Sequence, residues 1–147
     1  MSDTIHVAQL LFSEDHPLSS VLNMTFYPVV NHTLRVDVDA PETFADCDDI
    51  HVHTGYNTLL LDTVLGSCAI GELKKAQPIA TVKLSCNHIH KAKINEPLTC
   101  NAYFDGDENS ISNVRGEIIS RESNRVISHA VATFMIGTAA KPLEQKS

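Results

Sequence analysis

The chain has 147 residues, of which 43% are hydrophobic and 20% charged, and it carries a net charge of -7 at pH 7. This length and composition indicate one globular domain, large enough to form a core without disulfide or metal cross-links. The acidic balance argues against a nucleic-acid-binding surface, which needs an excess of basic residues. No apolar run reaches the roughly 18 residues of a membrane span, and the first residues lack the pattern of a secretion signal. The sequence therefore predicts a cytoplasmic protein without membrane contact.

The N-terminal part is predicted to contain a short helix and two strands. Apolar residues predict the helix over residues 3–12. It belongs to an N-terminal extension, residues 1–15, and a polar segment that includes Pro17 interrupts it. Strands are expected over residues 23–30 and 34–39, the second with alternating apolar and polar side chains. After an acidic loop over residues 42–49, a long helix is expected to begin near Thr54 or Gly55 and to end near Leu73.

The second half of the chain is predicted to be rich in strands. They are expected over residues 79–88, 98–104, 112–120 and 125–136, joined by polar turns. Apolar residues occur on both faces of the last strand, which predicts a central strand covered on both sides. Residues 138–147 are expected to form a flexible tail. A long apolar helix among antiparallel strands predicts an α+β fold in which the sheet wraps around the helix. The other surface or an edge of the sheet would then be buried against a second copy of the chain.

A single carboxylate, Asp62, lies in the most apolar stretch of the chain, residues 56–66. Burying an unpaired carboxylate is costly, so such a group raises its pKa or finds hydrogen-bond donors. Leucine and valine side chains occupy nearly every other side of the predicted helix. We therefore expect Asp62 to face a cleft or an interface, either as a working acid or as a polar group held by a neighbour such as Thr58 or Thr63.

The run from His53 to Gly66, HTGYNTLLLDTVLG, resembles the HGG-x(6)-D segment of hotdog-fold acyl-CoA thioesterases of the phenylacetate-pathway type. Residues 81–85 resemble the strand that follows the central helix of that family, and residues 116–119 with 126–134 resemble its closing hairpin. The likeness covers roughly residues 16–137. It implies a single hotdog domain over residues 1–147, in which an antiparallel sheet wraps around one long central helix. It also implies a homodimer, which two such dimers can extend to a homotetramer.

The resemblance implies hydrolysis of a CoA thioester at a site shared by two subunits. An acid on the helix of one chain would activate water against a thioester held at the helix entrance, residues 53–55, of the other chain. Asp62 matches the acid, and Thr81 matches a hydroxyl that helps to place the water. Thr54 and Gly55 occupy the two glycine positions, so their amides, at the positive end of the helix dipole, would be the oxyanion donors. The carboxylate would serve as general base or as nucleophile, and no cofactor is implied.

Two positions depart from the family pattern. The family often has an asparagine six residues before the histidine, where it helps to bind the carbonyl group, and this residue is Cys47 here. Thr54 replaces the first glycine. Asn57, one turn inside the helix, is a candidate to supply the missing amide group, and His53 belongs to the expected substrate-binding entrance.

The phosphates of a CoA thioester need cations on this acidic protein. Lysines and arginines near the expected pocket and dimer edge are Lys83, Lys91, Lys93, Arg115, Arg121 and Arg125. Lys91 and Lys93 are the first choice, because they follow the strand that carries Thr81.

Three other functions remain open. Two His-x-His pairs, residues 51–53 and 88–90, lie near Cys47 and Cys86, and on strands each pair could offer two nitrogens to zinc. A third ligand is not evident, so no metal is expected, and the four cysteines are expected to be free thiols. A hotdog dehydratase or hydratase would pair His53 with Asp62. A binding module that keeps the acyl-CoA pocket without turnover would also tolerate the two departures.

Overall fold

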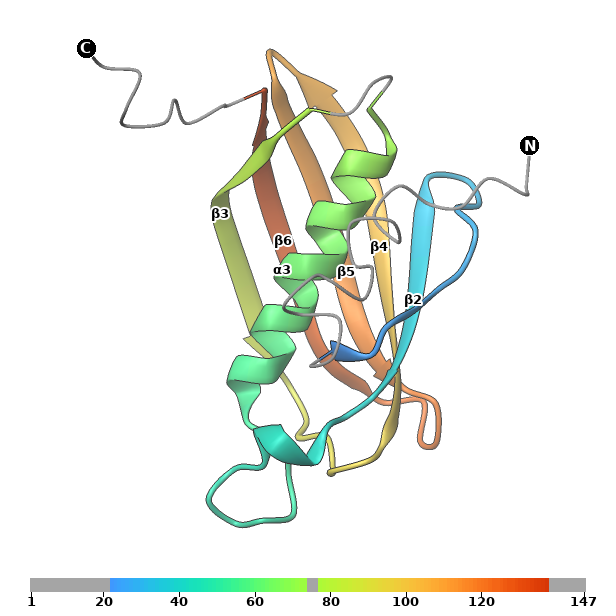
Figure 1. Cartoon of the computed structure of the whole chain (residues 1–147), viewed down its shortest axis with the longest axis vertical. Coiled ribbons are helices and arrows are strands. Elements are labelled where there is room, and N and C mark those ends of the chain that lie inside the picture. The colour runs from blue at the N-terminus through green and yellow to red at the C-terminus, as the bar shows by residue number, and fades with distance from the viewer. Residues whose placement is uncertain (1–21, 74–76, 138–147) are drawn as a thin grey trace.

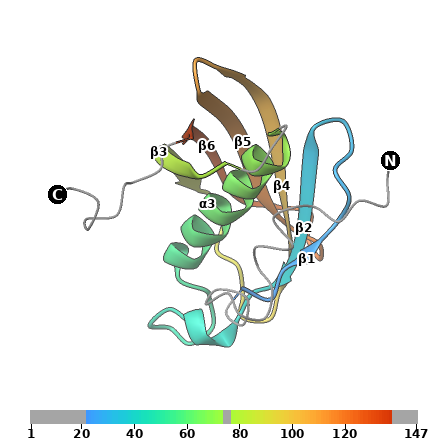
Figure 2. The same ribbon diagram turned by 45° about the horizontal axis from the view of Figure 1, so that its top comes forward.

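The computed structural model describes residues 22–73 and 77–137. One long helix lies across a six-stranded antiparallel sheet whose strand order is β1-β2-β4-β5-β6-β3 (Figure 1). Seen from a second direction, the sheet curves around the helix (Figure 2). The predicted α+β hotdog arrangement is therefore confirmed. The predicted helix over residues 3–12 and the tail over residues 138–147 lie outside the described residues.

The elements follow one another in the order that the sequence predicts. They are β1 (Thr25–Phe26), β2 (Thr33–Asp39), the 3-10 helix η1 (Glu42–Phe44), α3 (Thr54–Gly71), β3 (Ile79–His88), β4 (Pro97–Glu108), β5 (Ile111–Ser120) and β6 (Val126–Ile136). Within the described ranges, no helix is both long enough and apolar enough to cross a bilayer.

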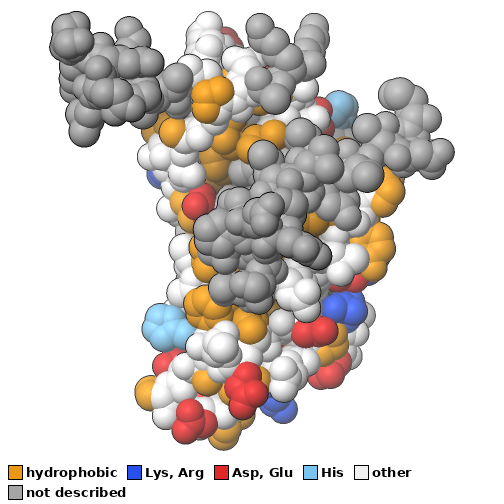
Figure 3. Space-filling model, in the orientation of Figure 1, with side chains coloured by type: hydrophobic (Ala, Val, Ile, Leu, Met, Phe, Trp, Pro, Cys, Tyr) orange, Lys and Arg blue, Asp and Glu red, His pale blue; other side chains and the backbone are white. Residues whose placement is uncertain are grey.

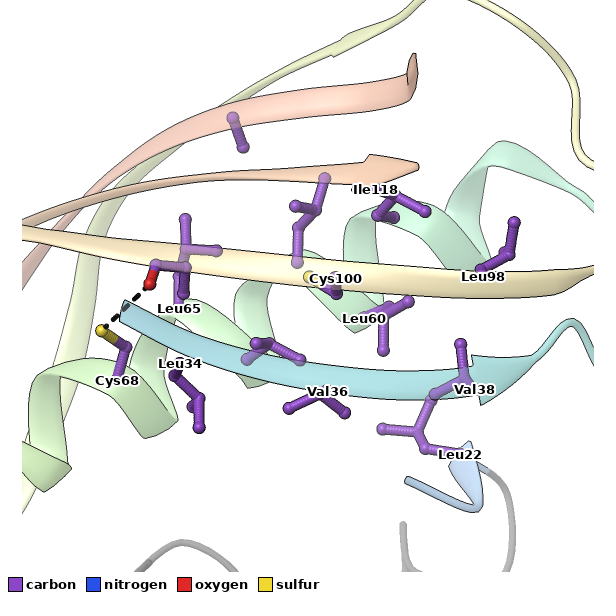
Figure 4. Packing of buried hydrophobic residues seen from close by; sticks show 14 of the residues in the cluster. Leu22, Leu34, Val36, Val38, Leu60, Leu65, Cys68, Leu98, Cys100 and Ile118 are labelled. Carbon is purple, nitrogen blue, oxygen red and sulfur yellow. Dashed lines mark hydrogen bonds between the residues drawn. The ribbon is translucent and has the colours of Figure 1, made fainter. Parts of the chain in front are cut away.

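The core lies between α3 and the concave face of the sheet (Figure 4). Buried helix residues include Leu60, Leu61, Val64 and Leu65, each with no exposed surface. Gly116 on β5 lets the helix approach, because a Cβ there would overlap the side chain of Leu65 and lie 2.8 Å from a backbone oxygen of β4. Close packing of this kind fixes the position of α3 on the sheet and hence the position of its polar side chains.

Two hairpin details differ from the sequence prediction. β1 covers only Thr25–Phe26 instead of residues 23–30, because Pro28 has no N–H to donate and the chain turns at Asn31 and His32, whose φ angles are 50° and 60°. β4 continues to Glu108, beyond the predicted end at residue 104. A bulge between Phe104 and Gly106 bends this strand, and the turn itself is formed later, by residues 109 and 110 with φ angles of 53° and 64°.

The prediction that both faces of β6 are covered is wrong for the described chain. β6 lies between β5 and β3, but its convex face leaves Val131 56% and Met135 39% exposed. The neighbouring β3 is an edge strand on which Val82 is 56% exposed. No described strand pairs with the outer edge of β3, whose backbone groups are thus open to a further strand.

Candidate active site

The loop before α3 is held together by Asp48. The backbone N–H groups of Ile50 and His51 both donate to Asp48 Oδ1 at 2.9 Å, and His51 Nδ1 donates to Oδ2 at 2.7 Å. The backbone and ring of His51, followed by the backbone of Ile50, hold the pKa of Asp48 well below its usual value. Acidic side chains gather at this end of the molecule (Figure 3). These hydrogen bonds hold the loop in the conformation that leads into the start of α3.

His53 caps the helix with its ring. It has extended backbone angles, φ -60° and ψ 138°, and its Nδ1 accepts the N–H of Gly55 at 2.8 Å. A Cβ on residue 55 would lie 2.9 Å from that ring nitrogen, so glycine is needed for the cap to form. The expectation of two free oxyanion donors is therefore corrected, because the Gly55 amide is already engaged. The N–H of Thr54 has no acceptor among the described residues and lies at the positive end of the helix dipole.

Asp62 lies on the side of α3 that faces the edge strand β3. It is half-buried, and Thr81 Oγ1 donates to its Oδ1 at 2.9 Å. Its partner is thus Thr81 instead of the predicted neighbours Thr58 or Thr63. In the described part of the chain, Asp62 Oδ2 has no hydrogen-bond partner and is available to accept one from water. The structure therefore brings together the acid and the hydroxyl that the sequence singled out.

The contact between Asp62 and Thr81 depends on an irregularity in β3. Thr81 lies opposite Phe134, and Leu84, Cys86 and His88 lie opposite Ala132, Ala130 and Ser128, all of which are buried. An extra residue at the bulge between Thr81 and Lys83 shifts the alternation by one place. Without the bulge, Thr81 would point to the convex face, away from the helix.

Polar residues continue from Asp62 toward the helix entrance. We call this row the α3–β3 stripe, and it comprises Thr54, Thr58 and Asp62 on α3 with Thr81, Cys86 and His88 on β3. Thr58 Oγ1 lies 3.3 Å from His88 Nε2, and His88 Nδ1 lies 2.7 Å from Ser128 Oγ. Burial raises the pKa of the Cys86 thiol, against a hydrogen bond with Thr58 that lowers it. Sequence reasoning did not find Thr58, His88 and Ser128 as one group, although the spacing of four between Thr54, Thr58 and Asp62 marks one face of a helix.

The other predicted binding residues are divided between surface and core. Cys47 is exposed in the loop before α3, where its N–H donates to Asp46 Oδ1 at 2.8 Å. Asn57 is 1% exposed and points into the core, where its Oδ1 has no partner, so the prediction that it replaces the missing amide is wrong. Lys91 Nζ lies 3.4 Å from Asp46 Oδ2, and Lys93 forms an isolated bridge with His51. Both lysines therefore lie beside the loop that leads to the helix entrance.

The histidines of the two His-x-His pairs all have other partners. His51 pairs with Asp48 and His53 caps α3, while His88 contacts Thr58 and Ser128, and His90 Nδ1 donates to the Val126 carbonyl at 3.0 Å. Over residues 22–73 and 77–137, no group of three His, Cys, Asp or Glu side chains is placed to hold a metal ion. His53 and Asp62, which a dehydratase would pair, do not contact each other within the described chain: Thr81 donates to Asp62 Oδ1, and Gly55 donates to His53 Nδ1.

A comparison with known protein families identifies one family. The family described as "Thioesterase superfamily" matches residues 51–127, which include the helix entrance, Asp62 and Thr81. No curated protein matches the chain.

Solved structures with the same fold include proteins linked to phenylacetic acid degradation. One, from Ralstonia eutropha, is 20% identical with a TM-score of 0.75, over 87% of this chain and 98% of that chain. The PaaI protein of Escherichia coli, from the phenylacetic acid degradation operon, is 10% identical with a TM-score of 0.76, over 88% of this chain and 91% of that chain. A Streptococcus mutans protein with bound acetyl-CoA is 16% identical with a TM-score of 0.69, over 78% of this chain and 88% of that chain. At these identities the likeness shows a shared fold.

Proposed function

Because this chain belongs to the thioesterase superfamily, we propose that it is an acyl-CoA thioesterase in which Asp62 activates the attacking water. The observation that carries the proposal is the contact of 2.9 Å between Thr81 Oγ1 and Asp62 Oδ1. That contact orients a carboxylate on the edge of the helix and leaves its second oxygen available. A carboxylate held in this way can take a proton from water during attack on a thioester.

The proposed reaction uses three groups, the Thr54 amide of one subunit with Asp62 and Thr81 of its partner. The amide of Thr54 donates to the thioester carbonyl oxygen and stabilises the negative charge that develops there. Asp62 accepts a proton as the water oxygen attacks the carbonyl carbon, and Thr81 keeps the carboxylate in place. The carbon–sulfur bond then breaks, and the proton passes from Asp62 to the CoA thiolate. Direct attack by Asp62, through an anhydride that water later hydrolyses, uses the same groups.

A second copy of the chain is proposed to complete the site. A water that attacks a carbonyl carbon must lie within about 3.5 Å of it, whereas Asp62 follows Thr54 by eight positions, which separates them by roughly 12 Å along the helix axis. The helix entrance that serves Asp62 is therefore assigned to a partner subunit. The open edge of β3 and its exposed Val82 support pairing along this strand. The resulting homodimer is the smallest complete enzyme, and two dimers could pair into a tetramer.

The substrate is proposed to be a CoA thioester, as in the Streptococcus mutans protein with bound acetyl-CoA. Lys91 and Lys93 support this assignment, because both residues lie beside the loop before α3, where Lys91 Nζ is 3.4 Å from Asp46 Oδ2 and the backbone of Lys93 bridges to His51. Weaker binding of CoA at high salt, and a further loss in the Lys91→Ala/Lys93→Ala variant, would support their contact with the phosphates. Unchanged binding in that variant would remove it.

A binding module without turnover is the second candidate. It is favoured by the engagement of the Gly55 amide by His53, which removes one of the two expected backbone donors at the helix entrance. The exposed Cys47, where the family often has an asparagine, points in the same direction. Such a protein would bind an acyl-CoA without releasing CoA.

The two candidates are separated by incubating the purified protein with a panel of acyl-CoAs and a thiol reagent that detects free CoA. We expect turnover by the wild-type protein and a loss of at least about a hundredfold in Asp62→Asn. Glu72→Gln, which removes a carboxylate at the other end of α3, is the matched control and should retain activity. Binding of acyl-CoA without release of CoA would refute the enzyme and support the module.

A further inference from the structure

His88 connects three elements at the end of the α3–β3 stripe. It is the last residue of β3, and its ring lies between Thr58 of α3 and Ser128 of β6, at 3.3 Å and 2.7 Å respectively. Ser128 has no exposed surface, so this end of the chain of contacts is anchored in the core. At the other end, Thr58 Oγ1 donates to the carbonyl oxygen of Thr54 at 3.3 Å.

One tautomer of His88 gives every group in this chain of contacts a partner of the opposite kind. In the tautomer with its hydrogen on Nε2, His88 donates to Thr58 Oγ1, whose own hydrogen goes to the Thr54 carbonyl. In the neutral ring Nδ1 is then an acceptor, and it receives the hydroxyl hydrogen of Ser128. The contacts thus run in one direction, from Ser128 through His88 and Thr58 to the first turn of α3.

This network ends on the peptide unit that joins Thr54 to Gly55. The carbonyl of that unit accepts from Thr58, and its N–H donates to the ring of His53. Both ends of the unit therefore have side-chain partners, in the turn of the helix whose N–H groups otherwise lack acceptors. The free N–H of Thr54 belongs to the adjoining peptide unit, so its direction depends on the same constraints.

We infer that His88 is a positioning residue for the Thr54 amide. By joining Ser128 to Thr58, it holds the first turn of α3 against β3 and β6 so that the Thr54 N–H points at a fixed place. This inference rests on the proposed function, in which that amide binds the thioester oxygen. The contribution is to geometry, because His88 touches the helix and the sheet and does not need to touch the substrate.

The test compares His88→Phe with His90→Phe. Both variants replace a histidine ring by a phenyl ring near the same end of β3, but the His90 ring hydrogen-bonds to the Val126 carbonyl of β6 and, among the described residues, makes no hydrogen bond to α3. For His88→Phe we expect kcat to fall by about ten- to a hundredfold with KM changed less than about twofold, because a misdirected donor acts in the transition state. His90→Phe should retain the wild-type kcat. His88→Gln, whose amide N–H can still donate to Thr58, should recover part of the loss.

A second readout does not require activity. Hydrogen exchange of the Gly55 amide, followed by NMR, should become at least about tenfold faster in His88→Phe and stay unchanged in His90→Phe. Thr58→Val, which removes only the hydroxyl, should have the same effect, and the double variant should show no further loss because the two residues act as one unit.

The outcomes separate this inference from the proposed function. A wild-type protein that releases no CoA would refute the proposed function, while the exchange rates would still decide whether His88 orders the helix entrance. Equal exchange and equal kcat in His88→Phe and His90→Phe would overturn the inference. If His88→Phe does not fold, Thr58→Val decides alone, since unchanged exchange and kcat in that variant would also overturn it.

Discussion

Replacing Thr54 by proline would remove the proposed oxyanion donor and little else. Proline lacks the N–H group and is favoured at the first position of a helix, where its fixed φ angle suits the first turn. Thr54 is the first residue of α3, and its N–H has no acceptor among the residues that the structure describes. His53 has φ -60° and ψ 138°, which a residue before proline readily adopts. The substitution therefore breaks no hydrogen bond seen within the chain.

The expected effects on stability and on rate differ widely in size. Stability should change by less than about 1 kcal/mol, because no helical hydrogen bond is lost and proline restricts the unfolded chain. Loss of one oxyanion donor typically costs about 2.7–4 kcal/mol in the transition state, which corresponds to a fall in kcat of about a hundred- to a thousandfold. Thr54→Ala is the matched control, since it removes the side chain and keeps the amide.

The assay measures CoA release from an acyl-CoA together with thermal unfolding of each variant. We expect Thr54→Pro to lose activity at nearly wild-type stability and Thr54→Ala to retain most of it. A Thr54→Pro protein with kcat within a few-fold of wild type would refute the assignment of this amide. Equal losses in the two variants would instead assign the effect to the threonine side chain.

Three further predictions concern the packing of α3, the buried carboxylate of Asp37 on β2 and the contact between Thr81 and Asp62. Gly116→Ala should destabilise the protein by about 1–3 kcal/mol in urea unfolding, because its Cβ would meet Leu65 and a backbone oxygen, whereas Gly66→Ala, with contacts of 3.5 Å or more, should be neutral or stabilising. Burial alone would raise the pKa of Asp37, but hydrogen bonds from Arg35, Thr99 and Tyr27 hold it below its usual value. Asp37→Asn should therefore lower the free energy of unfolding by about 2 kcal/mol at pH 7. The difference in unfolding free energy between variant and wild type should shrink as the pH falls below about 4, because the wild-type carboxylate then takes up a proton. A difference that stays constant with pH would contradict this reasoning. Thr81→Val should lower kcat about tenfold or more without unfolding the chain, since it removes the hydrogen bond to Asp62, and an unchanged rate would count against a role for Thr81.

Most elements of the fold could be predicted from local sequence patterns. The start of α3 follows from the His53-Thr54-Gly55 segment, and β3, β5 and β6 end within one residue of their predicted bounds, because alternation and turn residues are local signals. The exceptions depend on backbone geometry that side-chain type does not specify. Gly106, with φ 120°, lets β4 bend and continue where the polar residues suggested a turn.

The sequence singled out Asp62 and Thr81, but most of the contacts between the site residues could not be predicted from it. Asp62 stands out as one acid in an apolar helix, but its partner Thr81 reaches the concave face only through a bulge that the sequence does not announce. The prediction that Asn57 binds the substrate was wrong, because this side chain is buried in the core. The group formed by His88, Thr58 and Ser128 joins residues up to 70 positions apart, so only the strand register brings it together.

The central claim is that Asp62 of one subunit serves the helix entrance of its partner, and mixing two inactive variants tests it most directly. An equal mixture of Asp62→Asn and Thr54→Pro chains, dissociated and reassembled, should contain half hybrid dimers, each with one site in which both groups are intact. We predict that activity returns to about a quarter of the wild-type value, since two-fold symmetry gives each hybrid one working site of two. A mixture that stays inactive while hybrid dimers form would contradict the shared site, because it would place Asp62 and the Thr54 amide of one catalytic centre in the same chain.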